Sequence, residues 1–220
     1  MEILLQPAVL AAARAPHLVV DVRSAAAYAA DHLPGAHHVA DLQAALLAFD
    51  ADDFTAQRPR FQAALAELGT SGAETLVFYD DGAPGFSLAC RAFVAFAQLG
   101  YPRLALLEGG LRGWLAAGLP ATQAAPAPRS PGLPLLRAGD VIAGKRCVRD
   151  ALEREHSVLL DVREEDEWSG AVSSPIDPDY CPRRGRIPGA RWLAAGRIVR
   201  QAASGLTARP LAEIRDECLN

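Results

Sequence analysis

Cysteine is scarce in this chain. The 220 residues contain four scattered cysteines, Cys90, Cys147, Cys181 and Cys218. A disulfide-stapled fold needs a dense set of paired cysteines, and a structural zinc site needs Cys or His at short fixed spacings. Neither pattern is present, so the sequence argues against both kinds of scaffold. We expect no metal and no cofactor.

An excess of positive charge and a long hydrophobic run are also missing. The formal net charge is −4 and the isoelectric point is about 5.7, whereas nucleic-acid and anionic-membrane binding need a basic surface. No apolar run approaches the roughly 20 residues that cross a bilayer. Glu2 stands where a signal peptide carries Lys or Arg. We therefore expect a cytoplasmic protein without nucleic-acid or membrane partners.

What the sequence does contain is an internal repeat. Residues 17–39 and 157–193 each hold an apolar strand ending in Asp-Val-Arg, a short acidic-aromatic helix and an apolar-Pro-Gly-Ala turn. Asp21 matches Asp161 at an offset of 140 residues, and Pro34 matches Pro188 at an offset of 154. The second copy therefore carries 14 extra residues, about 171–184, whose Pro and Asp content indicates a surface loop.

The repeat suggests a division of the chain. Segment 121–134 is dominated by Pro and Ala and keeps no hydrophobic period, which is typical of an extended linker. We expect a first domain at 1–120, this linker, and the N-terminal part of a second domain at 135–220.

The first domain alternates strands and helices, which predicts an α/β fold with a mostly parallel sheet. Ser24 is suited to cap the first helix. The expected strands are 18–22, 75–80 and 103–110, and the expected helices are 25–31, 41–48, 59–68, 86–99 and 111–118. Ligands of such sheets bind beyond the carboxyl ends of the strands, and Asp80 lies at one of these ends.

The segment after the second strand is a Gly-rich turn that leads into a helix. The backbone N–H groups of such a turn suit an anion, yet the turn begins with Asp80 and Asp81. We expect the acid to cap the helix N-terminus, with a cation site as the alternative.

Residues Tyr28–Val39, YAADHLPGAHHV, fit the signature of rhodanese-like domains: an aromatic residue, three residues, His, an aliphatic residue, Pro-Gly-Ala, two residues and an aliphatic residue. The preceding Asp-Val-Arg and the later Leu107–Trp114 resemble the strand and the Gly-Gly…Trp segment of the same family. The sequence resembles the two-domain thiosulfate and 3-mercaptopyruvate sulfurtransferases. It implies tandem domains, each a mostly parallel sheet flanked by helices, with the second copy incomplete.

The resemblance implies sulfur transfer from a small anionic donor, thiosulfate or 3-mercaptopyruvate, to a thiol or cyanide acceptor through a cysteine persulfide. In the family the nucleophilic cysteine opens the loop that follows the strand matching LVFYD, and here Asp80 holds the nucleophile position. A carboxylate cannot accept sulfur and repels an anionic donor, so we expect the first domain to be inactive. Cys90 is expected to pack against the sheet.

In two-domain members the working cysteine belongs to the second domain. The repeat spacing places the counterpart of Asp80 near position 234, beyond Asn220. Segment 210–220, which contains Cys218, resembles the helix before the catalytic strand. We therefore expect the second copy to stop before its cysteine loop, to leave a sheet edge exposed, and to make this chain inactive by itself. We assign no catalytic residue in it.

Two arginines are candidate substrate-binding residues. The resemblance implies that Arg163 faces the pocket, where its fork can pair with a carboxylate or sulfonate. A structural ion pair at the sheet rim is the equal alternative, because Arg23 keeps the motif in the inert copy. Arg186 stands where the first copy has His32, and either adds positive potential or stabilises the fold. His37 and His38 are expected in a loop.

Three functions are consistent with these residues. The first is rhodanese-type sulfur transfer, and the alternative is a non-catalytic rhodanese-like binding or regulatory protein. A related phosphatase-like activity is third, and it also needs a cysteine at the start of the loop.

Overall fold

The computed structural model describes residues 3–47, 54–82, 88–130, 132–137, 139–173, 182–202 and 205–219. The chain divides into two compact units, Met1–Ile142 with Gln201–Leu206 and Ala143–Arg200 with Thr207–Asn220. Within the described ranges, no helix has both the length and the apolar composition needed to cross a membrane.

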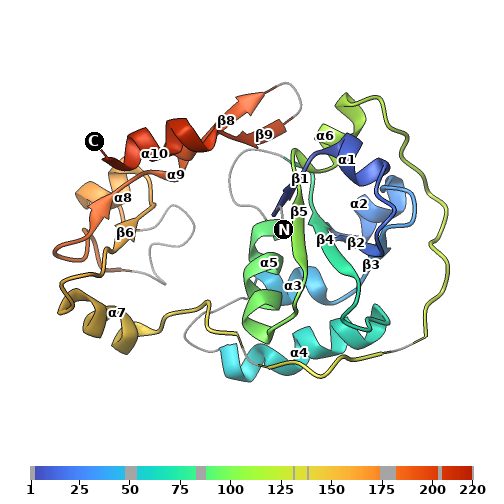
Figure 1. Ribbon diagram of the computed structural model, residues 1–220, viewed down its shortest axis with the longest axis horizontal. Helices are drawn as coiled ribbons and strands as arrows, with labels where there is room; N and C mark the ends of the chain where they lie inside the picture. Colours follow the sequence, from blue (N-terminus) through green and yellow to red (C-terminus); the bar gives the residue numbers. More distant parts are fainter. Residues whose placement is uncertain are drawn as a thin grey trace. The chain divides into compact units, whose positions relative to one another are not determined.

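The first unit is built on a five-stranded parallel sheet with strand order β1-β5-β4-β2-β3 (Figure 1). The central strands β2 and β4 are mostly apolar, and the last four residues of each are buried, as expected of strands covered on both faces. The strands are β1 (Leu4–Leu5), β2 (His17–Asp21), β3 (His37–His38), β4 (Thr75–Tyr79) and β5 (Leu104–Leu107).

Helices cover both faces of this sheet. Because side chains alternate along a strand, Leu18 and Val20 of β2 pack in one core cluster and Val19 packs in the other. The first cluster is covered by α3 (Leu42–Leu47), α4 (Phe54–Glu67) and α5 (Leu88–Leu99). The second is covered by α1 (Pro7–Ala11) and α6 (Gly110–Ala116), with Tyr28 of α2 (Ala25–Ala30) packed against it.

The predicted elements of the first unit are confirmed apart from their ends, and Ser24 caps α2 by accepting a hydrogen bond from Ala27 N at 3.2 Å. Two predictions are wrong. His37 and His38 form β3 rather than a loop, because Val20 and Asp21 of the neighbouring strand pair with them. Cys90 is exposed rather than packed against the sheet, because its place on α5 turns it away from the buried stripe Ala89, Ala92 and Phe96.

The second unit repeats the start of the first. Its elements are α7 (Lys145–Leu152), β6 (Leu160–Asp161), α8 (Glu165–Ser169), β7 (Arg191–Trp192), α9 (Ala195–Ile198) and α10 (Leu211–Leu219). Strands β6 and β7 are parallel, and Asp161 pairs with Trp192 as Asp21 pairs with His38. Strands β8 (Val199–Ala202) and β9 (Gly205–Ala208) form a separate two-stranded sheet.

The two ends of the 14-residue insertion in the second copy lie close together. A Cβ atom added to Gly170 would lie 3.1 Å from the backbone nitrogen of Gly185, so the two ends of the insertion touch. Closed ends of this kind let a long insertion sit on a fold without disturbing it. Residues 174–181 of the insertion lie outside the described residues.

The Pro- and Ala-rich segment is held against the first unit. Thr122 and His32 exchange backbone hydrogen bonds of 2.8 and 2.9 Å. Further along, the Arg129 guanidinium donates to the Leu68 carbonyl at 3.0 Å and to Glu74 at 2.6 Å. The segment is therefore fixed by specific contacts and does not run free between the repeats.

Candidate functional site

The carboxyl end of β4 is occupied by a carboxylate. Asp80 accepts hydrogen bonds from the backbone N–H of Gly82 at 2.9 Å and of Ala89, in the first turn of α5, at 3.1 Å. The prediction that an acid caps this helix is thereby confirmed for Asp80. Among the described residues no cluster of His, Cys, Asp and Glu could hold a metal ion, so nothing there favours the cation alternative.

The turn beside Asp80 packs tightly against the start of α6. Gly82 has φ +70°, and a Cβ atom there would lie 1.8 Å from the carbonyl oxygen of Gly109. The backbone N–H of Leu111 donates to the carbonyl of Asp80 at 2.8 Å. A Cβ atom on Gly110 would lie 2.4 Å from the carbonyl oxygen of Asp80, so only glycine permits this approach at positions 82 and 110. Residues 83–87 of the loop lie outside the described residues.

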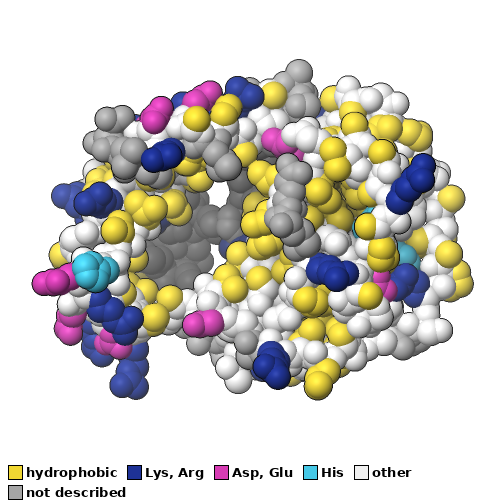
Figure 2. Space-filling view, viewed as in Figure 1, with side chains coloured by type: hydrophobic (Ala, Val, Ile, Leu, Met, Phe, Trp, Pro, Cys, Tyr) yellow, Lys and Arg dark blue, Asp and Glu magenta, His cyan; other side chains and the backbone are white. Residues whose placement is uncertain are grey.

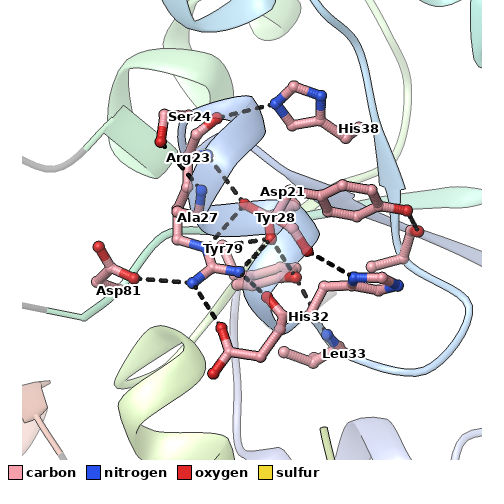
Figure 3. A network of polar contacts seen from close by, with 12 residues as sticks. Asp21, Arg23, Ser24, Ala27, Tyr28, His32, Leu33, His38, Tyr79 and Asp81 are labelled. Atoms are coloured by element: carbon pink, nitrogen blue, oxygen red, sulfur yellow. Dashed lines mark hydrogen bonds and ion pairs between the residues drawn. The ribbon is translucent and has the colours of Figure 1, made fainter. Parts of the chain in front are cut away.

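A charge network centred on the buried pair Arg23 and Asp21 includes Asp81, the residue that follows Asp80 (Figure 3). Arg23 is 5% exposed and Asp21 is fully buried, and Nε and Nη2 of the arginine donate to the two aspartate oxygens at 3.0 and 2.8 Å. The remaining donor, Nη1, contacts Asp81 at 3.0 Å and Asp31 at 3.3 Å. Burial by itself lowers the pKa of Arg23, but the hydrogen bonds and charge of Asp21 outweigh it, so the net pKa is raised.

Tyr79 completes this network from β4. Its hydroxyl donates to Asp21 Oδ2 at 2.5 Å and accepts from the backbone N–H of Leu33 at 3.2 Å. Burial, and then the charge of Asp21, raise the pKa of Tyr79. Tyr79 is not among the residues expected from the sequence, although a Tyr at the end of a buried strand needs a partner for its hydroxyl.

Three aromatic rings stack beside the arginine. Tyr28 lies between His32 and His38, with ring centroids 4.0 and 5.1 Å apart. The Nε2 atom of His38 lies 3.0 Å from the carbonyl oxygen of Arg23, so that nitrogen donates. Both ring nitrogens of His32 face carbonyl oxygens, of Tyr28 at 2.8 Å and of Ala124 at 3.1 Å.

The second unit reproduces the ion pair. Nε and Nη2 of Arg163 donate to the two oxygens of Asp161 at 2.9 and 2.6 Å. Nη2 also donates to the carbonyl of Gly185 at 2.9 Å, as Arg23 Nη2 does to the carbonyl of Asp31. The hydrogen bond from Arg163 is the main reason that the pKa of Asp161 is lowered. Arg163 thus forms the structural ion pair at the sheet rim that was the alternative to substrate binding. Its binding to a substrate stays a prediction.

The stack is also repeated, with different side chains. Trp168 replaces Tyr28, Arg186 replaces His32 and Trp192 replaces His38. The Arg186 guanidinium lies 4.7 Å above the ring of Trp168, and Trp168 stacks on Trp192 at 6.2 Å. Trp192 Nε1 donates to the carbonyl of Arg163 at 2.9 Å, which is the bond that His38 makes to Arg23. The packing of Arg186 on Trp168 agrees with the alternative in which Arg186 stabilises the fold. Its binding to an anion stays a prediction.

The two candidate arginines line the same hollow. A pocket of about 630 Å³ lies between the end of β6, residues 159–163, and the turn 183–190. Its apolar wall includes Leu160, Val162 and Ile187, and four arginines contribute to the lining: Arg163, Arg183, Arg184 and Arg186. A concave, partly apolar hollow with several guanidinium groups suits an anionic ligand.

The chain is similar to known proteins over most of its length. Residues 7–117 match the family described as Rhodanese-like domain. The chain is 30% identical to thiosulfate sulfurtransferase of Azotobacter vinelandii, a match covering 89% of this chain and 71% of the relative. It is 34% identical to a probable 3-mercaptopyruvate sulfurtransferase of Pseudomonas aeruginosa, with coverage of 76% and 58%.

Solved structures show the same fold. The wild-type structure of EanB superposes with a TM-score of 0.75 at 22% identity, covering 97% of this chain and 56% of that one. The 3-mercaptopyruvate sulfurtransferase from Leishmania major gives 0.72 at 21% identity, covering 99% and 61%. The chain thus spans 58 to 71% of the two curated relatives and little more than half of these structures.

Proposed function

The chain belongs to the rhodanese-like sulfurtransferase family, and on that premise we propose that it takes part in transferring sulfane sulfur from thiosulfate or 3-mercaptopyruvate to a thiol or cyanide. The first unit is a non-catalytic rhodanese-like domain, and the second unit is the N-terminal part of another. The observation that carries this division is Asp80, which holds the nucleophile position with its carboxylate bonded to Gly82 N–H and Ala89 N–H.

The reaction needs a cysteine thiolate. The thiolate attacks the outer sulfur of thiosulfate, the sulfur–sulfur bond of the donor breaks, and sulfite leaves with the electron pair. The cysteine then holds a persulfide, Cys–S–S⁻. Cyanide or a thiolate attacks the terminal sulfur and releases the cysteine thiolate. We propose that none of the four cysteines of this chain, Cys90, Cys147, Cys181 and Cys218, is this nucleophile.

The second unit supplies the cationic side of the site. Arg163 and Arg186 line one pocket, and guanidinium groups pair with the sulfonate-like end of thiosulfate or the carboxylate of 3-mercaptopyruvate. Asp161 orients Arg163 through two hydrogen bonds. Arg186 packs against Trp168. Its guanidinium therefore has less conformational freedom to lose when it binds an anion.

A non-catalytic binding or regulatory protein is the second candidate. Asp80 also favours it, because the carboxylate fills the anion cradle and cannot accept sulfur as a thiolate does. The two candidates differ in anion binding, because only the sulfurtransferase needs a site for a small anionic donor.

Turnover is tested on the 220-residue chain itself. The chain is incubated with thiosulfate and cyanide, and separately with 3-mercaptopyruvate and a thiol, and thiocyanate or pyruvate is measured. The intact mass is recorded for an adduct of about 32 Da, one sulfur. We expect no turnover and no adduct. Turnover with an adduct mapped to Cys90, Cys147, Cys181 or Cys218 would overturn the assignment of the nucleophile.

Anion binding is measured in parallel by titrating thiosulfate into the chain and following Trp fluorescence. Arg163→Lys, which keeps the charge but loses the fork, and Arg186→Ala are each expected to weaken binding about tenfold. Arg14→Ala, at an exposed arginine of the first unit, is the control and should bind as the parent does. If thiosulfate does not bind the parent chain, the binding-module candidate is favoured.

A further inference from the structure

A separate hollow lies within the first unit, between α3 and α4. The two helices pack against each other, yet a cavity of about 410 Å³ remains between them. This volume falls in the range of small-molecule pockets, about 300–1,000 Å³. Buried Val39 and Leu42 contribute to its lining. Small apolar side chains from both helices line it as well: Ala44, Ala45, Ala63 and Ala64.

Three charged side chains also line this hollow. Asp41 directly precedes α3, Arg60 and Glu67 belong to α4, and all three are exposed. Within the described residues, none of these three side chains makes a hydrogen bond or an ion pair. Figure 2 shows basic and hydrophobic side chains next to each other along the edge of the first unit where Figure 1 shows α4. The hollow therefore combines an apolar lining with charges of both signs that are available to a ligand.

The two charges on α4 are separated by an apolar stretch. Arg60 and Glu67 are seven residues apart, which is about two turns and about 10 Å along the helix axis. Side chains three or four residues apart meet on a helix surface, and for both charged residues these positions hold Ala63 and Ala64. This face of α4 thus offers one charge of each sign with only methyl groups between them.

The end of α4 favours a cation. Glu67 is its last residue, and the last turn holds no basic residue. A helix C-terminus carries partial negative charge, which adds to the attraction of the carboxylate for a positive group. Arg129 reaches the Leu68 carbonyl beyond the helix, but its guanidinium pairs with Glu74 and not with Glu67. The Glu67 end therefore suits an ammonium group, and the Arg60 end suits a carboxylate.

We propose that the hollow between α3 and α4 binds a short zwitterionic peptide of mainly apolar residues. Its ammonium group pairs with Glu67 and Asp41, its carboxylate pairs with the Arg60 guanidinium, and its apolar side chains cover the alanines. An extended chain spans about 3.3–3.6 Å per residue, so about three residues match the distance between the charges on α4. Two carboxylates at the hollow disfavour a small dianion such as thiosulfate, so this binding is independent of sulfur transfer.

The probe is the tripeptide Ala-Leu-Ala, titrated into the full, isotope-labelled chain while NMR follows the backbone amides. We expect saturable shifts at 41–45 and 60–67. The N-acetylated and the C-amidated peptides each lack one charge and should bind about three- to fivefold more weakly at low salt, the size of one exposed ion pair. These differences should shrink at about 0.5 M salt, because exposed charges are screened.

Substitutions assign each end of the peptide. Arg60→Gln should make the free and the amidated peptide bind equally, while the acetylated peptide still binds more weakly. Glu67→Gln combined with Asp41→Asn should have the opposite effect. Arg58→Gln, at an arginine of the same helix that does not line the hollow, is the control and should keep both preferences. Each preference compares peptides on one variant, so it does not depend on a change in stability.

A further substitution fills the hollow. Ala63→Leu places a larger side chain in it and should weaken every form of the peptide at least about tenfold, because the apolar contacts are displaced. Ala116→Leu, at an exposed alanine of α6, should bind as the parent does.

Three outcomes would overturn the proposal. One is the absence of saturable shifts at 41–45 and 60–67 with the peptide at about 5 mM, a concentration at which even millimolar affinity gives substantial occupancy. Another is equal binding of Ala-Leu-Ala and the doubly blocked peptide, which would mean that the charges recognise nothing. Shifts confined to 159–163 and 183–190 would place the peptide in the pocket of the second unit instead.

Discussion

Arg23 and Asp21 form an ion pair that is almost completely removed from water, with Nη2 2.8 Å from Oδ2. Breaking such a pair from one side leaves the other charge buried and uncompensated, which costs roughly 3–5 kcal/mol. We therefore expect Arg23→Ala to destabilise the first unit by about that amount in urea unfolding at pH 7.

Arg23→Lys is the matched variant. It restores the charge without the planar fork that contacts both oxygens of Asp21, so its loss of stability should lie between those of the parent and Arg23→Ala. A cost of less than about 1 kcal/mol for Arg23→Ala, the range of exposed pairs, would show that water enters the network.

Glu74 makes the docking of the Pro-rich segment sensitive to acid. Burial raises the pKa of Glu74, but this is outweighed by hydrogen bonds from its own backbone N–H, from the hydroxyl and N–H of Ser71 and from Arg129, and the pKa is lowered to about 2. A lowered folded-state pKa stabilises the fold above the unfolded value, near 4.5, and this stability is lost as pH falls towards 2. Glu74→Gln should thus cost about 1–3 kcal/mol at pH 7.

The check is urea unfolding of the parent and Glu74→Gln between pH 7 and pH 2. The difference between the two should stay constant above about pH 5 and shrink below it, as linkage requires. A difference that does not change with pH would mean that the Glu74 carboxylate contributes through packing and not through its charge.

The cradle at Asp80 should activate a thiol placed in it. In Asp80→Cys the sulfur replaces a carboxylate that two backbone N–H groups contact, and donors at a helix N-terminus lower the pKa of a thiol. The charge of Asp81 opposes this effect, so the pKa should fall further in Asp80→Cys/Asp81→Asn.

Iodoacetamide alkylation between pH 5 and 9, mapped by mass spectrometry, measures both pKa values. The exposed native thiol Cys90 is the internal control in the same molecule. We expect Cys at position 80 to be alkylated at a lower pH than Cys90. Equal profiles would show that the Gly82 and Ala89 N–H groups do not act on this position.

His32 holds the Pro-rich segment in place through its ring. Its Nε2 atom contacts the carbonyl of Ala124 at 3.1 Å, beside the backbone bridge to Thr122. His32→Ala removes this contact and leaves the Ala124 carbonyl oxygen without its ring partner. Hydrogen exchange at Thr122 and proteolysis within 121–134 should both become at least about fivefold faster, which corresponds to roughly 1 kcal/mol of lost local stability.

Gln123→Ala serves as the comparison, because Gln123 makes an exposed hydrogen bond to Ala30 in the same segment. It should change both rates by less than twofold, in keeping with the small effect of exposed contacts. Equal acceleration in the two variants would mean that the segment is held by its backbone bridge alone.

Local sequence determined a large part of this protein. The apolar runs at 18–22 and 75–80 predicted β2 and β4, Ser24 predicted the start of α2, and the repeated Asp-Val-Arg predicted that Asp21 and Asp161 are equivalent. These features depend on hydrophobic burial and on hydrogen bonds between residues that are close in the chain. The sequence also predicted the capping role of Asp80, because acidic residues are favoured at the start of a helix.

The tertiary structure alone decided the contacts between distant residues. Tyr79 and Asp81 reach Asp21 and Arg23 across 58 positions, and His32 reaches Ala124 across 92. Strand β3 has only two residues, both histidines, and exists because β2 offers it a free edge. Similar apolar strands are buried as β2 and exposed as β6, since burial depends on what packs against a strand and not on the strand's own sequence.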